Sequence, residues 1–184
     1  VATTWGQVEN PSLLQMAVPS LNIAPDARGG GMGDMGAATL PDINSQYWNA
    51  AKYAFMGSKA GVSLSYTPWL RKLVNDVALV NMTGYYKLGN SDLQAISASL
   101  RYFSLGEVNI WENIGDVPYG LNPYEMAFDV AYSRKLSESY SMAVTLRYIR
   151  SDMGTDQNEE SNAGNAFAAD ISGYLEKYVL MGNA

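Results

Sequence analysis

The sequence predicts an all-β protein, an antiparallel transmembrane β-barrel with an N-terminal plug. Three observations predict it. A glycine-rich segment precedes the first strand pattern, and the remainder of the 184 residues alternates between apolar residues and small or polar ones. Each pattern runs to about ten residues, the length that a tilted strand needs to cross a bilayer. We therefore divide the chain into an N-terminal extension with a plug or hatch, residues 1–58, and transmembrane strands, residues 59–184.

The composition excludes several classes of protein. Charged residues make up only 16% of the chain, and 13 Tyr and 4 Trp accompany just 4 Phe. Tyr and Trp are the residues that line a membrane–water interface. A net charge of -6 without a basic run argues against a nucleic-acid partner. Because the chain has neither Cys nor His, thiol catalysis, Ser-His-Asp chemistry and most zinc sites are excluded, and we expect neither enzymatic activity nor a cofactor.

The region before the strands is predicted to be mostly irregular. Residues 1–24 show no clear period, and residues 25–40 contain too much Gly for a regular element beyond a helical turn over 32–38. The stretch from Asp42 to Phe55 predicts a short helix that Asp42 or Asn44 would cap.

Six strands are expected after this region. They lie near residues 60–66, 76–87, 96–102, 126–132, 142–148 and 168–179. In the fourth, Met126, Phe128, Val130 and Tyr132 alternate with Ala127, Asp129 and Ala131, which predicts an apolar face toward lipid and a small or polar face toward the lumen. Six strands are fewer than the eight that close the smallest common barrel, so we expect only part of a barrel.

The connections between the strands also alternate. Residues 88–92 and 136–139 form short connections, whereas 67–75, 104–123 and 151–165 form longer ones. Outer-membrane barrels have short periplasmic turns and long external loops, so the long connections are predicted to lie at the cell surface. Three aromatic residues there are predicted surface-loop contacts for a partner; they are Trp111, Tyr119 and Tyr124. The alternative for Trp111 and Tyr119 is a place in the outer aromatic girdle against lipid headgroups.

Four charged residues fall on the predicted lumen face of four successive strands and alternate in sign. They are Arg101, Asp129, Arg147 and Asp170. Facing inward, they can pair across neighbouring strands and hold the wall rigid. A gate or a binding ladder is the alternative interpretation.

Two further motifs allow a ligand. Residues 31–36 fit the G-x-G-x-x-G dinucleotide pattern, but no strand precedes them and Pro41 ends any helix, so we interpret the glycines as positions of close backbone approach in a plug. Five acidic or amide residues after the fifth strand could bind calcium, but they lack the spacing and central Gly of an EF-hand, so we interpret them as a solvated acidic loop and expect no metal site. These residues are Asp152, Asp156, Asn158, Glu159 and Glu160.

Two segments carry a resemblance to a known family. Residues 26–39, a glycine-rich run that ends in Ala-Ala-Thr, together with residues 47–55, which begin Tyr-Trp-Asn, resemble the start of the PorV family, outer-membrane barrels of the Bacteroidetes type IX secretion system. The resemblance implies a FadL-like barrel of which this chain covers the N-terminal half. It also implies plug or hatch positions at Asp26, Arg28, Gly29, Gly30, Gly31, Gly33, Asp34, Trp48 and Asn49. Ala50 departs from the pattern, because FadL-like sequences tend to have Pro there.

The resemblance further implies a non-enzymatic role in the outer membrane. Such a protein would receive secreted cargo by its C-terminal signal domain at the translocon barrel. It would then deliver the cargo to the sortase-containing attachment complex at the cell surface, with outer-membrane lipids around it. A FadL-like transporter of hydrophobic small molecules is the alternative, and a soluble ligand-binding barrel is the least favoured of the non-enzymatic functions.

Overall fold

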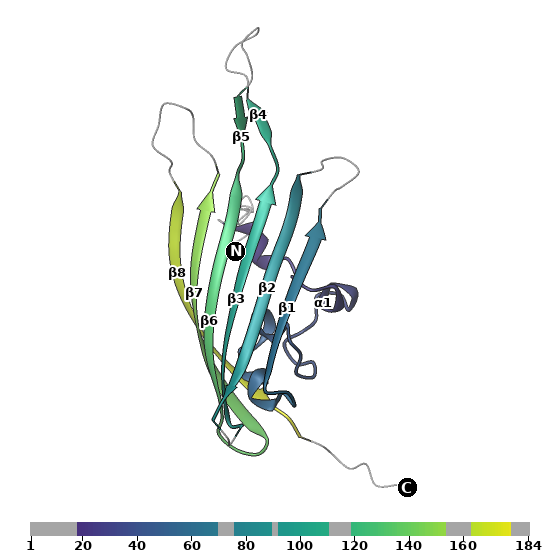
Figure 1. Ribbon diagram of the computed structural model, residues 1–184, viewed down its shortest axis with the longest axis vertical. Coiled ribbons are helices and arrows are strands. Elements are labelled where there is room, and N and C mark those ends of the chain that lie inside the picture. Colours follow the sequence, from purple (N-terminus) through teal and green to yellow (C-terminus); the bar gives the residue numbers. More distant parts are fainter. Residues whose placement is uncertain (1–17, 70–75, 90–91, 111–118, 154–162, 178–184) are drawn as a thin grey trace, which may run out of the picture.

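The computed structural model describes residues 18–69, 76–89, 92–110, 119–153 and 163–177. These residues form mostly antiparallel β-sheet with a few short helices, so the all-β prediction is confirmed. A six-stranded sheet has the order β1-β2-β3-β6-β7-β8, and β4 with β5 forms a separate two-stranded hairpin (Figure 1). The strands are β1 (Ala60–Pro68), β2 (Val77–Leu88), β3 (Gln94–Leu105), β4 (Val108–Ile110), β5 (Tyr119–Leu121), β6 (Tyr124–Lys135), β7 (Tyr140–Asp152) and β8 (Gly164–Leu175).

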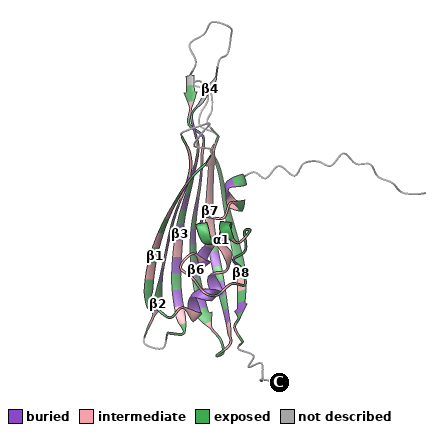
Figure 2. Ribbon diagram, turned by 90° about the vertical axis from the view of Figure 1, so that its right-hand side faces the viewer, coloured by how far each residue is buried: buried purple, intermediate pink, exposed green. Residues whose placement is uncertain are grey.

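The two faces of the six-stranded sheet have opposite chemistry. On the outer face, apolar side chains remain exposed in each of the six strands of this sheet, as with Leu64 at 73% and Leu146 at 63%. On the inner face, Ser, Thr, Ala and charged residues are covered by residues 18–58, which pack along the sheet (Figure 2). The alternation predicted for residues 126–132 is present in β6, where Phe128 and Val130 are exposed and Asp129 is buried.

The strand connections divide between the two ends of the sheet. The short turns β2–β3 and β6–β7 lie at one end, called the short-turn end, and the other connections lie at the opposite, long-connection end (Figure 1). Two predicted boundaries are wrong. The connection predicted over 104–123 begins later than expected, since β3 continues to Leu105, and it contains the strands β4 and β5. The last strand begins about four residues early, because Gly164 pairs with Ser151 near the end of β7.

The sheet is not closed within the described residues. There, β1 pairs only with β2 and β8 only with β7, so closure into a barrel stays a prediction, as does the division at residue 58. No helix among the described residues is long and apolar enough to cross a membrane.

The glycine-rich segment is more regular than predicted. It contains the helix α1 (Ala27–Gly31), whereas the expected turn over 32–38 is absent from the described helices. The helix forms despite its glycines because the carboxylate of Asp26 accepts a hydrogen bond from the Gly29 N–H at 2.7 Å and caps its first turn. Upstream, Pro19 begins the 3-10 helix η1 (Pro19–Asn22), in a region expected to be irregular.

The helix predicted over residues 42–55 is broken in two. It consists of α2 (Ser45–Trp48) and the 3-10 helix η2 (Ala50–Phe55), separated by Asn49 in an extended conformation with φ -165° and ψ 98°. The break is stabilised because the Asn49 side chain accepts a hydrogen bond from the Ala51 N–H at 3.0 Å and caps η2. Asn44 occupies the N-cap position of α2, as predicted, but its side chain makes no capping hydrogen bond. Asp42 is not the cap and accepts a hydrogen bond from the Ser45 hydroxyl.

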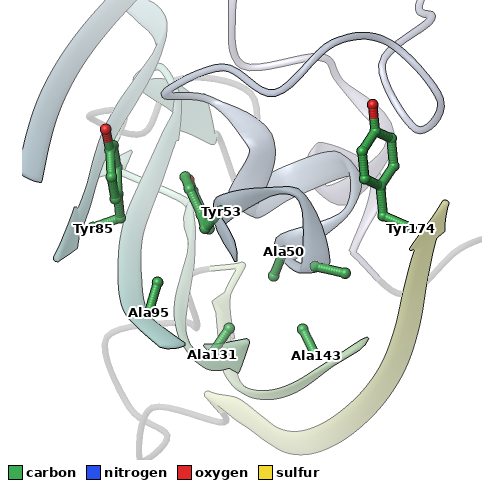
Figure 3. Close-up of a cluster of buried hydrophobic side chains, with 8 residues drawn as sticks. Ala50, Tyr53, Tyr85, Ala95, Ala131, Ala143 and Tyr174 are labelled. Atoms are coloured by element: carbon green, nitrogen blue, oxygen red, sulfur yellow. The ribbon is translucent and has the colours of Figure 1, made fainter. Parts of the chain in front are cut away.

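A seat of small residues holds η2 on the inner face near the short-turn end. Ala95, Ala131 and Ala143, from three adjacent strands, point toward the helical turn that carries Ala50 (Figure 3). All of these residues are at most 2% exposed. Tyr53 of η2 stacks on Tyr85 with 4.9 Å between ring centroids. Because the alanines bring the backbone of η2 close to the strands, the Ser141 hydroxyl can donate to the Ala51 carbonyl at 2.7 Å.

Enlarging one seat residue should therefore loosen η2. In Ala131→Leu, the added volume has no space in the close-packed seat, so we expect the free energy of unfolding to fall by about 1–3 kcal/mol. The control Val130→Leu changes the adjacent residue on the exposed outer face and should have an effect below about 0.5 kcal/mol. Urea titration of the protein in detergent micelles measures both. Equal losses in the two variants would contradict the seat.

Candidate functional site

The candidate functional site is the contact between the inner face of the sheet and the segment 18–58, called the hatch. The hatch folds around Trp48. The Asp26 carboxylate caps α1 and also accepts the Trp48 indole N–H at 3.3 Å. A Cβ at Gly29 would lie 2.9 Å from the indole ring, and a Cβ at Gly36 only 2.3 Å from it. The predicted hatch residues Asp26, Gly29 and Trp48 therefore form one packed unit.

The four glycines predicted to be needed for packing have different roles. Gly29 lies against Trp48, and Gly33 has φ +76°, a conformation that only glycine adopts at little cost. Around Gly30 and Gly31, no described atom lies within 4 Å of the position of a Cβ, so close packing does not require them. Gly36 was not predicted individually, although it has the closest approach to the indole.

The other predicted hatch residues make weaker or more peripheral contacts. Arg28 forms an ion pair with Asp42 at 3.0 Å, but its side chain is 51% exposed, so the pair contributes little to stability. Asp34 has φ 58° and borders an open depression of about 470 Å³ beside Trp48. Asn49 donates to the Gly173 carbonyl of β8 at 3.0 Å and thereby joins the hatch to the last strand of the sheet.

Sequence reasoning missed a buried lysine in the hatch. Lys52 is 0% exposed, and its ammonium group donates to the Gly36 carbonyl at 2.8 Å and to the Thr39 hydroxyl at 3.1 Å. Burial lowers the pKa of Lys52, while the charge of Asp42 partly opposes this change. The lysine thus joins η2 to the loop that packs on Trp48. In the sequence, Lys52 stands between the apolar residues Ala51 and Tyr53, and this setting could have indicated that the lysine is buried.

Polar contacts also join α2 to the six-stranded sheet, which forms the wall behind the hatch. Gln46 accepts a hydrogen bond from the Ser97 hydroxyl of β3 at 2.6 Å, and its backbone N–H donates to the Tyr53 hydroxyl at 2.9 Å. Tyr53 in turn donates to the Ile43 carbonyl at 2.8 Å. Burial raises the pKa of Tyr53 above its ordinary value.

The four predicted lumen charges all lie on the inner face, but they form two groups. Asp129 accepts hydrogen bonds from Arg147 at 2.6 Å and from Ser99 at 3.0 Å, and Arg147 lies 3.8 Å from Asp170. These three residues form an ion-pair chain across β6, β7 and β8. Arg101 is not part of the chain. It contacts the hatch instead, with its guanidinium group 4.4 Å from the centroid of the Tyr47 ring.

The predicted loop contacts are only partly described. Trp111 lies outside the described residues, as do Asp156, Asn158, Glu159 and Glu160 of the acidic loop, and Tyr119 begins β5. Tyr124 does not lie in a loop but begins β6, where its ring stacks on Tyr102 with 5.5 Å between centroids. The described residues gather no group of three side chains that could hold a metal ion.

Tyrosines border an apolar band on the outer face. In β6, Tyr124 lies at the long-connection end and Tyr132 eight residues later, a separation of about 26 Å along the strand. The outer-face residues of β6 between them are Met126, Phe128 and Val130. A band about 25 Å tall between aromatic girdles is characteristic of strands that cross an outer membrane. Tyr66 and Tyr102 extend one border, and Tyr86 extends the other.

The fold and this site define a class of protein: a membrane-type antiparallel sheet whose inner face is covered by its own N-terminal hatch. The family described as type IX secretion system protein PorV matches residues 7–181, nearly the whole chain, and the chain belongs to this family. Membership implies an outer-membrane component of type IX secretion. No curated protein matches the chain at a significant level.

The close approach at Gly36 leads to a prediction. In Gly36→Ala, the new methyl group would overlap the Trp48 ring, so we expect the hatch to be destabilised by about 1–3 kcal/mol. In the control Gly30→Ala, the methyl group meets no described atom and the better helix propensity should leave α1 equally or more stable. The rate of tryptic cleavage after Arg28 reports opening of the hatch. Faster cleavage is expected in the first variant alone, and the same rate in both would show that Gly36 does not constrain the hatch.

Proposed function

We propose that the chain forms wall strands and the hatch of a FadL-like outer-membrane barrel that acts in cargo transfer. In this proposal, further strands close the sheet between β1 and β8. The barrel receives secreted proteins by their C-terminal signal domain at the translocon barrel and delivers them to the sortase-containing attachment complex. It performs no catalysis. Membership of the PorV family is the observation that carries the proposal.

The hatch contacts support docking at the cell surface over passage through the lumen. At the short-turn end, η2 lies on its alanine seat and Asn49 is bonded to β8. A hydrophobic small molecule that crosses the lumen would have to displace these contacts, which is the requirement of the alternative function, a FadL-like transporter. A cargo that docks at the long-connection end would leave them in place.

The membrane part of the proposal can be tested at Val130, which lies in the apolar band between its middle and the Tyr132 border. Val130→Arg places a charge in the hydrocarbon region, where it should cost about 1–3 kcal/mol, less than at the bilayer midplane. Folding into phospholipid vesicles, followed by heat-modifiable gel mobility, should show less folded protein. Val130→Met is the matched apolar control and should fold like the parent chain. Equal folding of both variants would contradict a lipid-facing β6.

The cargo part can be tested by changing the two ends separately. Deletion of residues 154–162 shortens the β7–β8 connection at the long-connection end, and Glu138→Ala alters the exposed β6–β7 turn at the other end. Both proteins should remain in the outer membrane. Co-purification of a cargo with the C-terminal signal domain should fall several-fold in the deletion alone. Loss of cargo in Glu138→Ala, with full retention in the deletion, would reverse the assigned sidedness.

A further inference from the structure

Two opposite charges are buried side by side on the inner face near the long-connection end. Arg101 of β3 is 5% exposed, and Glu125 of β6 is 0% exposed. Burying a charge is costly unless a partner compensates it. Nevertheless, none of the ion pairs found among the described residues joins these two side chains. Each charge is therefore compensated by something other than its neighbour.

Both charged groups bind the main chain of η1. The Ser20 N–H donates to Oε2 of Glu125 at 3.0 Å. Arg101 Nη1 donates to the Ser20 carbonyl at 3.2 Å and to the Leu21 carbonyl at 3.4 Å. The Tyr47 hydroxyl also donates to the Leu21 carbonyl, at 3.0 Å. Ser20 therefore bonds to both charges: its N–H donates to the Glu125 carboxylate, and its C=O accepts a hydrogen bond from the Arg101 guanidinium group.

These contacts set few requirements on the sequence of the bound segment. They use backbone groups of Ser20 and Leu21, so most side chains could occupy the flanking positions. Ser20 itself is 3% exposed, which requires a small residue there. Proline is excluded at that position because it has no N–H.

The resident segment does not satisfy the site completely. Oε1 of Glu125 is buried, and no described group donates a hydrogen bond to it. An ionised carboxylate can accept about four hydrogen bonds, and η1 provides one described donor. The Leu21 N–H is directed elsewhere, since it donates to the Val18 carbonyl within the 3-10 turn. A different peptide conformation could supply the missing donor.

We propose that Arg101, Glu125 and Tyr47 form a binding site for a peptide segment of a partner polypeptide, and that Pro19–Asn22 is its resident, displaceable occupant. The ligand is a short segment with a small, non-proline residue at the position of Ser20, bound through its backbone. The seat of η2 lies at the opposite end of the inner face, so the exchange leaves the rest of the hatch attached. The site does not depend on the proposed role in cargo transfer.

The test uses the full chain in detergent micelles and a fluorescent, acetylated peptide that copies residues 18–23. Ser20→Pro removes the resident N–H and disfavours the helical turn at Pro19, whereas the control Ser20→Ala keeps both. Fluorescence anisotropy should show at least about tenfold tighter peptide binding to Ser20→Pro, because one charge-assisted hydrogen bond of the occupant is lost. Equal binding to the two proteins, or binding to neither, would overturn the proposal.

Two further measurements locate the bound peptide. N-methylation of the serine nitrogen replaces the donor to Glu125 by a methyl group and should weaken binding to Ser20→Pro by about tenfold or more. Adding Arg101→Met or Glu125→Met to Ser20→Pro should have a similar effect in protein whose β-sheet circular dichroism is unchanged. If the methylated peptide binds as well as its parent, the site does not recognise the backbone. None of these readouts uses cargo, so they stand apart from the test of secretion.

Discussion

The polar inner face of a single sheet is the constraint on which the rest of the structure depends. The outer face of the same strands is apolar and carries no protein layer among the described residues. Serine, threonine and charged side chains on the inner face must nevertheless find hydrogen-bond partners where they are buried. The hatch supplies many of them. Ser97 bonds to Gln46, Ser141 to the Ala51 carbonyl, and Arg101 to η1, so wall and hatch complete each other.

The hatch is attached in different ways along its length. Near the short-turn end, η2 packs closely on alanines, and its removal would expose apolar surface and leave the Ser141 hydroxyl without its acceptor. Near the long-connection end, η1 is held mainly through backbone groups bound by Arg101, Glu125 and Tyr47. Packing of this kind tolerates little change in shape, whereas backbone hydrogen bonds can be exchanged for those of another chain.

Much of the wall could be predicted from the period-two pattern, because lipid-facing and lumen-facing residues differ in polarity along each strand. The faces of β6 and β7, including Asp129 and Arg147, follow directly from it. Strand ends were less predictable, since they depend on pairing. Tyr124 belongs to β6 because its strand pairs with β3 and β7.

The position of the hatch in the chain and some of its packing residues could be predicted from the sequence, but its three-dimensional arrangement could not. The run of glycines suggested close packing, yet their separate roles depend on where Trp48 lies in space. The break at Asn49 also divides the stretch that was expected to form a single helix into α2 and η2. Arg101 was expected within the ladder of wall charges. Its contact with η1 spans about 80 residues of sequence, a separation that a local pattern cannot reveal.

These separations have a consequence for the order of folding. The hatch precedes the strands in sequence, yet its partners come much later: Glu125 is 105 residues beyond Ser20, and Gly173 is 124 residues beyond Asn49. Contacts between residues so far apart form slowly, because a long loop must first be closed. The hatch must therefore await strands that are synthesised after it. During that interval the groups that face the sheet, such as the Ser20 N–H and the Ala51 carbonyl, remain accessible to water and to chaperones. Formation of β6, β7 and β8 thus controls when this surface of the hatch can become buried.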